Sequence, residues 1–79
     1  MKAKVYVTLK PSILDPQGKT ITQALHTLGY DAITDVRQGK FFELDIEVDS
    51  PEDARATASE VAERVLANPV IESCRVEVD

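Results

Sequence analysis

The sequence has few of the residues that usually stabilise or equip a very small domain. Its 79 residues include one cysteine, one histidine and no tryptophan. A single cysteine cannot form an internal disulfide, and one cysteine with one histidine cannot complete a structural zinc site. A core of this size leaves only a small margin of stability. Association with a second copy or with other proteins is therefore the expected source of further stability.

Positive charge and long apolar runs are also scarce. The formal net charge is -5 at pH 7. Because a phosphate backbone needs a concentrated positive surface, we expect no nucleic-acid partner. The start of the chain, Met1 to Lys4, has no apolar signal core, and no apolar run reaches the length of a membrane span. These features favour a cytoplasmic protein that does not contact a membrane.

Four segments are predicted to be strands. Three of them show alternating apolar and polar residues: 2–10, 41–49 and 70–79. The strand predicted over residues 30–38 is less regular, because Ile33 and Val36 have opposite parity and would face opposite sides. Gly39 follows it, and its freedom to adopt positive φ predicts a tight hairpin leading into a central strand over 41–49.

Two helices are predicted between these strands. The first begins at Asp15 and Pro16 as cap and first position, carries apolar residues at helical spacing, and ends at Gly29. The second begins at Ser50 and Pro51 and extends to the corner Asn68–Pro69. The order of the elements is therefore strand, helix, strand, followed by the same unit again.

This order predicts a single α+β domain over residues 1–79. With right-handed crossovers it is a ferredoxin-like βαββαβ fold, in which a four-stranded antiparallel sheet carries both helices on one face. The first and third strands would then be neighbours. On the open face Lys2, Lys4 and Lys10 would lie across from Glu43, Asp45 and Glu47. Tyr6 and Phe41 add apolar area to the same face, which is a candidate interface between copies.

No group of residues favours catalysis or metal binding. Glu43, Asp45 and Glu47 alternate on the open face, where a solvated surface is preferred to a cation site. Cys74 shares the parity of nearby valines and is interpreted as a buried thiol. His26 is interpreted as an exposed helix residue. We expect no catalytic, cofactor-binding or metal-binding residue in this chain.

Four segments, by their order and spacing, resemble the PurS family, the small subunit of phosphoribosylformylglycinamidine synthase. The first and last are the most specific. The segments are Ile13-Leu14-Asp15-Pro16-Gln17-Gly18, Leu28-Gly29-Tyr30, Val36-Arg37-Gln38-Gly39-Lys40 and Leu66-Ala67-Asn68-Pro69-Val70-Ile71-Glu72. In length and coverage the whole chain is similar to that family.

The resemblance implies a non-catalytic subunit of a three-protein ligase in purine biosynthesis. In that family a glutaminase subunit releases ammonia from glutamine. A large synthetase subunit uses ATP and magnesium to convert formylglycinamide ribonucleotide to the amidine. The small subunit forms a homodimer, bridges the other two and assists ammonia transfer, with no cofactor of its own.

The turns are the expected places of partner contact, because loops held by a scaffold usually carry recognition. The candidate interface residues are Asp15, Pro16, Gln17, Gly18, Arg37, Gly39, Lys40, Asn68 and Pro69. For Asp15, Pro16, Gly39 and Asn68 a purely local role in capping and turning is an equal interpretation, whereas for Lys40 contact is favoured. The alternative function is a small-molecule-binding regulatory domain that acts as a homodimer.

Overall fold

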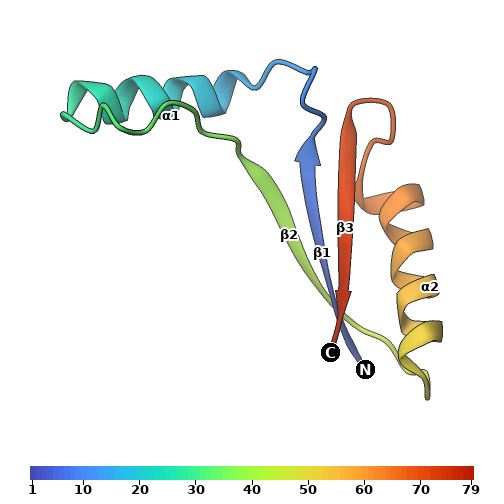
Figure 1. Ribbon diagram of the computed structural model, residues 1–79. Helices are drawn as coiled ribbons and strands as arrows, with labels where there is room; N and C mark the ends of the chain where they lie inside the picture. Colours follow the sequence, from blue (N-terminus) through green and yellow to red (C-terminus); the bar gives the residue numbers. More distant parts are fainter.

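A computed structural model describes all residues, 1–79, and contains a three-stranded antiparallel sheet with two helices. The elements in chain order are β1 (Lys2–Leu9), α1 (Pro16–Thr27), β2 (Gly39–Asp45), α2 (Pro51–Val61), the π-helical turn η1 (Ala62–Leu66) and β3 (Glu72–Val78). The central strand is β1, with β2 on one side and β3 on the other (Figure 1). The predicted α+β class and the pairing of the first strand with the segment after Gly39 are confirmed.

The core lies between one face of the sheet and α2. Ala3, Val5 and Val7 alternate along β1 and are completely buried. Ala58 and Ala62 are buried against them, and such small side chains let the helix lie close to the sheet. Figure 1 shows α2 beside β3, where it covers β3 and the central strand. We call this covered side of the sheet the inner face.

The prediction of a fourth strand over residues 30–38 is wrong. This segment instead runs back along α1, and the imidazole Nε2 of His26 lies 2.7 Å from the carbonyl oxygen of Ile33 (Figure 1). The opposite parity of Ile33 and Val36 explains the failure, because a strand here would have no consistent apolar face. As a result β2, predicted to be central, is an edge strand.

The predicted hairpin at Gly39 is also wrong. Gly39 is the first residue of β2 and pairs with Thr8 of β1. It does not adopt positive φ, which occurs only at Gly29 (φ 98°). A side chain at Gly39 would place its Cβ 2.5 Å from the carbonyl oxygen of Val7. The glycine therefore allows close approach of two strands and does not form a reverse turn.

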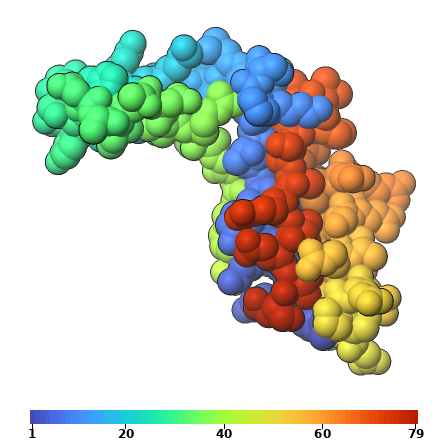
Figure 2. All heavy atoms as spheres, in the orientation of Figure 1, coloured from blue at the N-terminus to red at the C-terminus, as the bar shows by residue number.

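Only α2 covers the sheet, so the predicted placement of both helices on one face is incorrect. Residues 15–38, which comprise α1 and the returning segment 30–38, form an arm that projects on the side of β2 (Figures 1 and 2). The molecule is consequently elongated, with extents of 50 × 25 × 14 Å. Its radius of gyration of 15.8 Å exceeds the value of about 12 Å typical of a compact chain of this length. Neither helix has the length and apolar character needed to cross a bilayer.

Candidate protein-interaction surface at the root of the arm

Asp15 fixes the start of the arm. It caps α1, and one carboxylate oxygen accepts a hydrogen bond from the backbone N–H of Gly18 at 2.9 Å. The other oxygen accepts from the backbone N–H of Gln38, also at 2.9 Å, so this side chain joins both ends of the arm. These two bonds, from Gln38 and then Gly18, hold the pKa of the carboxyl below its ordinary value of 3.8, and the nearby Arg37 adds to the effect.

Arg37 fixes the loop that leads from β1 to the arm. Its Nη2 donates to three carbonyl oxygens: Leu9 at 3.3 Å, Lys10 at 3.0 Å and Ile13 at 3.2 Å. The two hydrogens of this one nitrogen are shared among the three oxygens, so a single side chain holds three points of the loop. The loop therefore depends on an arginine that comes more than twenty residues later in the chain.

Gly18 completes this elbow by allowing two segments of backbone to touch. It is buried in the first turn of α1. A Cβ built on it would lie 2.1 Å from the carbonyl oxygen of Val36 and 2.8 Å from a carboxylate oxygen of Asp15. Any larger residue would have to push the helix away from the returning segment. Asp15, Gly18 and Arg37 together set the direction in which the arm projects.

A second polar cluster connects β2 to the end of η1, because the side chain of Lys40 reaches across the inner face of the sheet. The ammonium of Lys40 is 3.5 Å from the carboxylate of Glu72 and 3.4 Å from the carbonyl oxygen of Leu66. The same Glu72 accepts a hydrogen bond from the backbone N–H of Asn68 at 2.8 Å. The side chain of Asn68 accepts from the N–H of Val70 at 3.1 Å, which confirms its local turn role. Although 52% of the Lys40 side chain is exposed, its charge already has internal partners.

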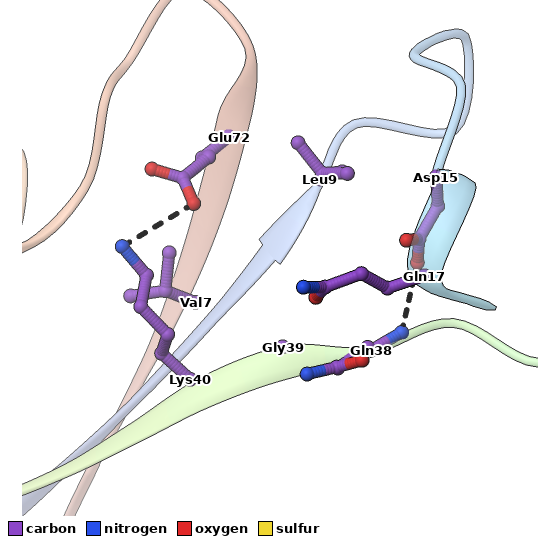
Figure 3. A pocket seen from close by; sticks show the side chains of 8 residues that line it. All are labelled: Val7, Leu9, Asp15, Gln17, Gln38, Gly39, Lys40 and Glu72. Atoms are coloured by element: carbon purple, nitrogen blue, oxygen red, sulfur yellow. Dashed lines mark hydrogen bonds and ion pairs between the residues drawn. The ribbon is translucent and has the colours of Figure 1, made fainter. Parts of the chain in front are cut away.

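A cavity of about 220 Å³ separates the two clusters (Figure 3). The amide side chains of Gln17 and Gln38 extend into it, with Lys40 and Glu72 at its other end. Most of its lining residues are polar, and they place hydrogen-bond donors and acceptors side by side. No group of three or more histidine, cysteine, aspartate or glutamate side chains in the chain is arranged to hold a metal ion. The arrangement suits contact with a polar group of another molecule.

The structure brings most of the predicted interface residues to this region. Those around the cavity are Asp15, Gln17, Gly39 and Lys40, and the elbow adds Gly18 and Arg37. Pro16 is exposed at the first position of α1. Asn68 and Pro69 are exposed beyond Glu72, at the corner between η1 and β3. Contact of these residues with a partner stays a prediction. Those that are buried or hydrogen-bonded also stabilise the chain itself.

Two residues of this region were missed by sequence reasoning. Gln38 and Glu72 were each interpreted only as part of a predicted strand and of a segment that resembles the family. Glu72 follows Asn68 by four residues, so a side-chain bond back to that corner was a recognisable local signal. No local signal could have indicated that Gln38 would bond to Asp15, because 23 residues separate them.

The open face of the sheet carries a second exposed cluster. The rings of Tyr6 and Phe41 lie 5.0 Å apart, as their predicted place on that face implies. The guanidinium of Arg75, which sequence reasoning did not place here, lies 4.5 Å above the Tyr6 ring. Lys2 lies 3.7 Å from Glu43 and 4.0 Å from Asp45, so the predicted opposition of charges across the strands is confirmed for this lysine.

The predictions for the histidine and the cysteine have different outcomes. His26 is exposed on α1, as predicted. Cys74 is exposed, so the prediction of a buried thiol is wrong. It has the parity of Val76 and pairs with Val7, but it lies at the rim where the chain leaves η1 for β3, beyond the cover of the helix.

A small α+β chain with a braced, projecting arm and several exposed clusters is typical of a subunit of a larger assembly. Comparison with known proteins identifies the assembly. The family profile PurS, described as phosphoribosylformylglycinamidine (FGAM) synthase, matches residues 2–79. The PurS subunit of FGAM synthase from Bacillus subtilis is 50% identical over 78 residues, which is 99% of this chain and 92% of that protein.

Solved structures give the same result. The B. subtilis PurS structure has a TM-score of 0.86 at 50% identity and covers 99% of this chain and 96% of that one. PurS from Methanocaldococcus jannaschii has a TM-score of 0.90 at 33% identity, covering 99% and 94%. A chain of the PurLQS structure from Thermotoga maritima has a TM-score of 0.89 at 28% identity, covering 99% and 95%. The chain belongs to the PurS family of FGAM synthase subunits.

Proposed function

We propose that this chain is the small, non-catalytic subunit of a cytoplasmic FGAM synthase, where it bridges the glutaminase and synthetase subunits and assists ammonia transfer between them. The observation that carries the proposal is the match of nearly the whole chain to the PurS family. The similar chain in the T. maritima PurLQS structure supports an assembly of this kind. ATP, magnesium and glutamine are then used by the partner subunits, with no cofactor in this chain.

A chemical reason supports the need for such an adaptor. Ammonia released into water is protonated and is then no longer a nucleophile, so a dry junction between the two active sites preserves it. The root of the arm presents polar groups around Gln17 and Lys40 for docking, and the corner between η1 and β3 adds Asn68. These groups position another protein without themselves making or breaking bonds.

The adaptor acts as a homodimer in this proposal. Only eight of the 79 residues are buried, and Val5 and Val7 are the only large side chains among those fully buried. Such a core is very small for an independent domain. A second copy supplies the missing burial.

A mixing experiment tests the subunit role. The purified chain is combined with candidate glutaminase and synthetase subunits in glutamine, ADP and magnesium, and the mixture is run on a sizing column. We expect one complex that contains all three proteins. If this chain elutes alone under those conditions, the proposal fails and the alternative of an independent regulatory domain gains support.

The partner-contact role of Lys40 is tested best by a neutral substitution. Charge reversal to Glu would set a carboxylate beside Glu72 and the Leu66 carbonyl, so the internal contacts now predict a disturbed fold for that variant. In Lys40→Gln the stem and a donor are kept. We expect reduced glutamine-dependent synthesis with ammonia-dependent synthesis and the melting temperature nearly unchanged. Equal loss of both activities would refute the contact role.

A further inference from the structure

The outer edge of β3 lies on the side of the sheet away from the arm (Figure 1). At one end of the ladder between β1 and β3, the N–H of Lys10 donates to the carbonyl oxygen of Ile71. At the other end, the N–H of Asp79 donates to Lys2. The odd-numbered residues of β3 therefore bond to β1, and the even-numbered residues direct their N–H and C=O groups outward. Such an edge offers backbone donors and acceptors to an extended chain that lies beside it.

One side chain limits how much of this edge can be paired. Nη1 of Arg55, on α2, donates to the carbonyl oxygen of Val76 at 3.3 Å. This bond occupies an outward acceptor in the second half of β3. The uncovered part of the edge is therefore the first half, around Cys74. A partner strand along the whole of β3 would have to displace Arg55, so the free part suits a short piece of extended chain.

A cavity of about 240 Å³ lies against this free part of β3. Cys74 lines it together with Glu63 of η1, and Ala67 and Pro69 supply apolar atoms. We call this cavity the β3 notch, and its lining residues are Glu63, Ala67, Pro69, Glu72, Ser73 and Cys74. Small-molecule sites measure about 300–1,000 Å³, so the notch is smaller than most of them. It suits a single side chain of another protein, like the pockets that hold anchor residues in protein interfaces.

The charge of the notch selects a basic side chain. Glu63 takes part in none of the ion pairs of the chain. Arg64, the next residue, is paired with Glu60 instead. Lys40 is paired with Glu72, and its ammonium also contacts a carbonyl oxygen at the end of η1. This end of the continuous helix formed by α2 and η1 carries partial negative charge, which adds to that of Glu63.

We propose that a partner subunit of the ligase lays a short extended segment along the first half of β3. The segment pairs with the backbone of Cys74 and places an arginine or lysine in the β3 notch against Glu63. Strand pairing then supplies affinity, and the anchor side chain supplies specificity. A second copy fits this surface less well, because the chain has a net charge of -5 and Arg55 interrupts the edge. The inference rests on the proposed function and adds the surface and the chemistry of one subunit contact.

The only cysteine of the chain reports on the notch directly. Cys74 is exposed, so iodoacetamide should alkylate it readily in the chain alone. The complex is formed with the glutaminase and synthetase subunits in glutamine, ADP and magnesium, and alkylation is followed by mass spectrometry of the peptide that contains Cys74. We expect the rate to fall at least about tenfold in the complex, because the thiol reacts only when the docked segment opens.

The other outcomes of this experiment separate the two proposals. An unchanged alkylation rate in a complex that has formed would overturn the contact at the notch and leave the proposed function standing. Protection that is present in the chain alone and increases with its concentration would assign the notch to a second copy, and would also overturn the contact. If no complex forms, the proposed function fails and the contact fails with it.

The charge at position 63 gives an independent readout. Glu63→Gln removes the charge with little change of shape, and Glu63→Lys reverses it. In titrations of the labelled chain into a mixture of the partner subunits, we expect the dissociation constant to rise at least about tenfold for Glu63→Gln and further for Glu63→Lys. Glu47→Gln is the matched control, because Glu47 is also exposed and outside the ion pairs, and it should bind like the wild type. Wild-type affinity of a folded Glu63→Lys chain would overturn the ionic contact.

Discussion

Replacing Gly18 with alanine should destabilise the protein, although local helix propensity predicts the opposite. Alanine inside a helix is favoured over glycine by about 0.5–1 kcal/mol. At this position the new methyl carbon would lie 2.1 Å from the Val36 carbonyl oxygen, deep inside contact distance. Overpacking of this kind costs about 1–3 kcal/mol. The steric cost should therefore exceed the propensity gain by roughly 1–2 kcal/mol.

The assay is thermal unfolding of Gly18→Ala by circular dichroism at fixed protein concentration. For a domain of this size 1 kcal/mol corresponds to about 4–8 °C, so we expect a fall of roughly 5–15 °C in melting temperature. Amide hydrogen exchange should report the same change locally. The N–H of Gln38, which donates to Asp15, should exchange faster than in the wild type once the helix is displaced.

Two control variants separate the steric effect from others. Gln23→Ala changes an exposed helix position and should shift stability by less than about 0.5 kcal/mol. In Gly29→Ala the new Cβ would meet no atom within 4 Å, but the residue has φ of 98°. Any loss of stability in this variant therefore reports backbone strain alone. A higher melting temperature for Gly18→Ala would refute the contact between the first turn of α1 and Val36, and with it the fixed elbow.

Two further predictions concern the same elbow. Because the pKa of Asp15 is lower in the folded than in the unfolded chain, its ionised form stabilises the fold above the ordinary value of 3.8 and this stability is lost as pH falls through the folded value. Between about pH 5 and about pH 2 the urea midpoint of Asp15→Asn should therefore fall less than that of the wild type. Equal falls in the two midpoints would show that the ionised Asp15 carboxylate does not stabilise the fold. Arg37→Met, which keeps a long stem but has no donor for the three carbonyl oxygens, should lower stability by about 1 kcal/mol, with Lys19→Met as a surface control. Stability unchanged in urea unfolding would show that the Arg37 bonds do not hold the loop.

The strands with strict alternation were predictable from the sequence because one face of each contacts the core. The alternation of Ala3, Val5 and Val7 predicts the buried face that the structure shows. The helix starts at Asp15 and Ser50 were also predictable, since a cap depends on atoms only three residues away. Local sequence patterns were sufficient to predict an element wherever no long-range contact competed with them.

The arm was not predictable in this way. Its direction depends on hydrogen bonds between Asp15 and Gln38 and between Arg37 and Lys10, which span more than twenty residues. The conflict of parity at Ile33 and Val36 was visible, but it was interpreted as an irregular strand. A strand without a consistent apolar face gains little by pairing, and here the backbone contacts α1 instead. For the interface candidates, sequence reasoning located the region but not the internal partners of Lys40.

The order of strands in the sheet has a consequence for biosynthesis. Every ladder of the sheet includes β1, which leaves the ribosome before both of its partners, and these begin only at Gly39 and Glu72. During translation one edge of β1 must therefore wait unpaired until β2 has emerged, and the other edge until β3 has emerged. Pairing over such separations is intrinsically slow. The nascent chain thus exposes an apolar segment that a chaperone, or an already finished copy nearby, can meet before its own C-terminal strand does.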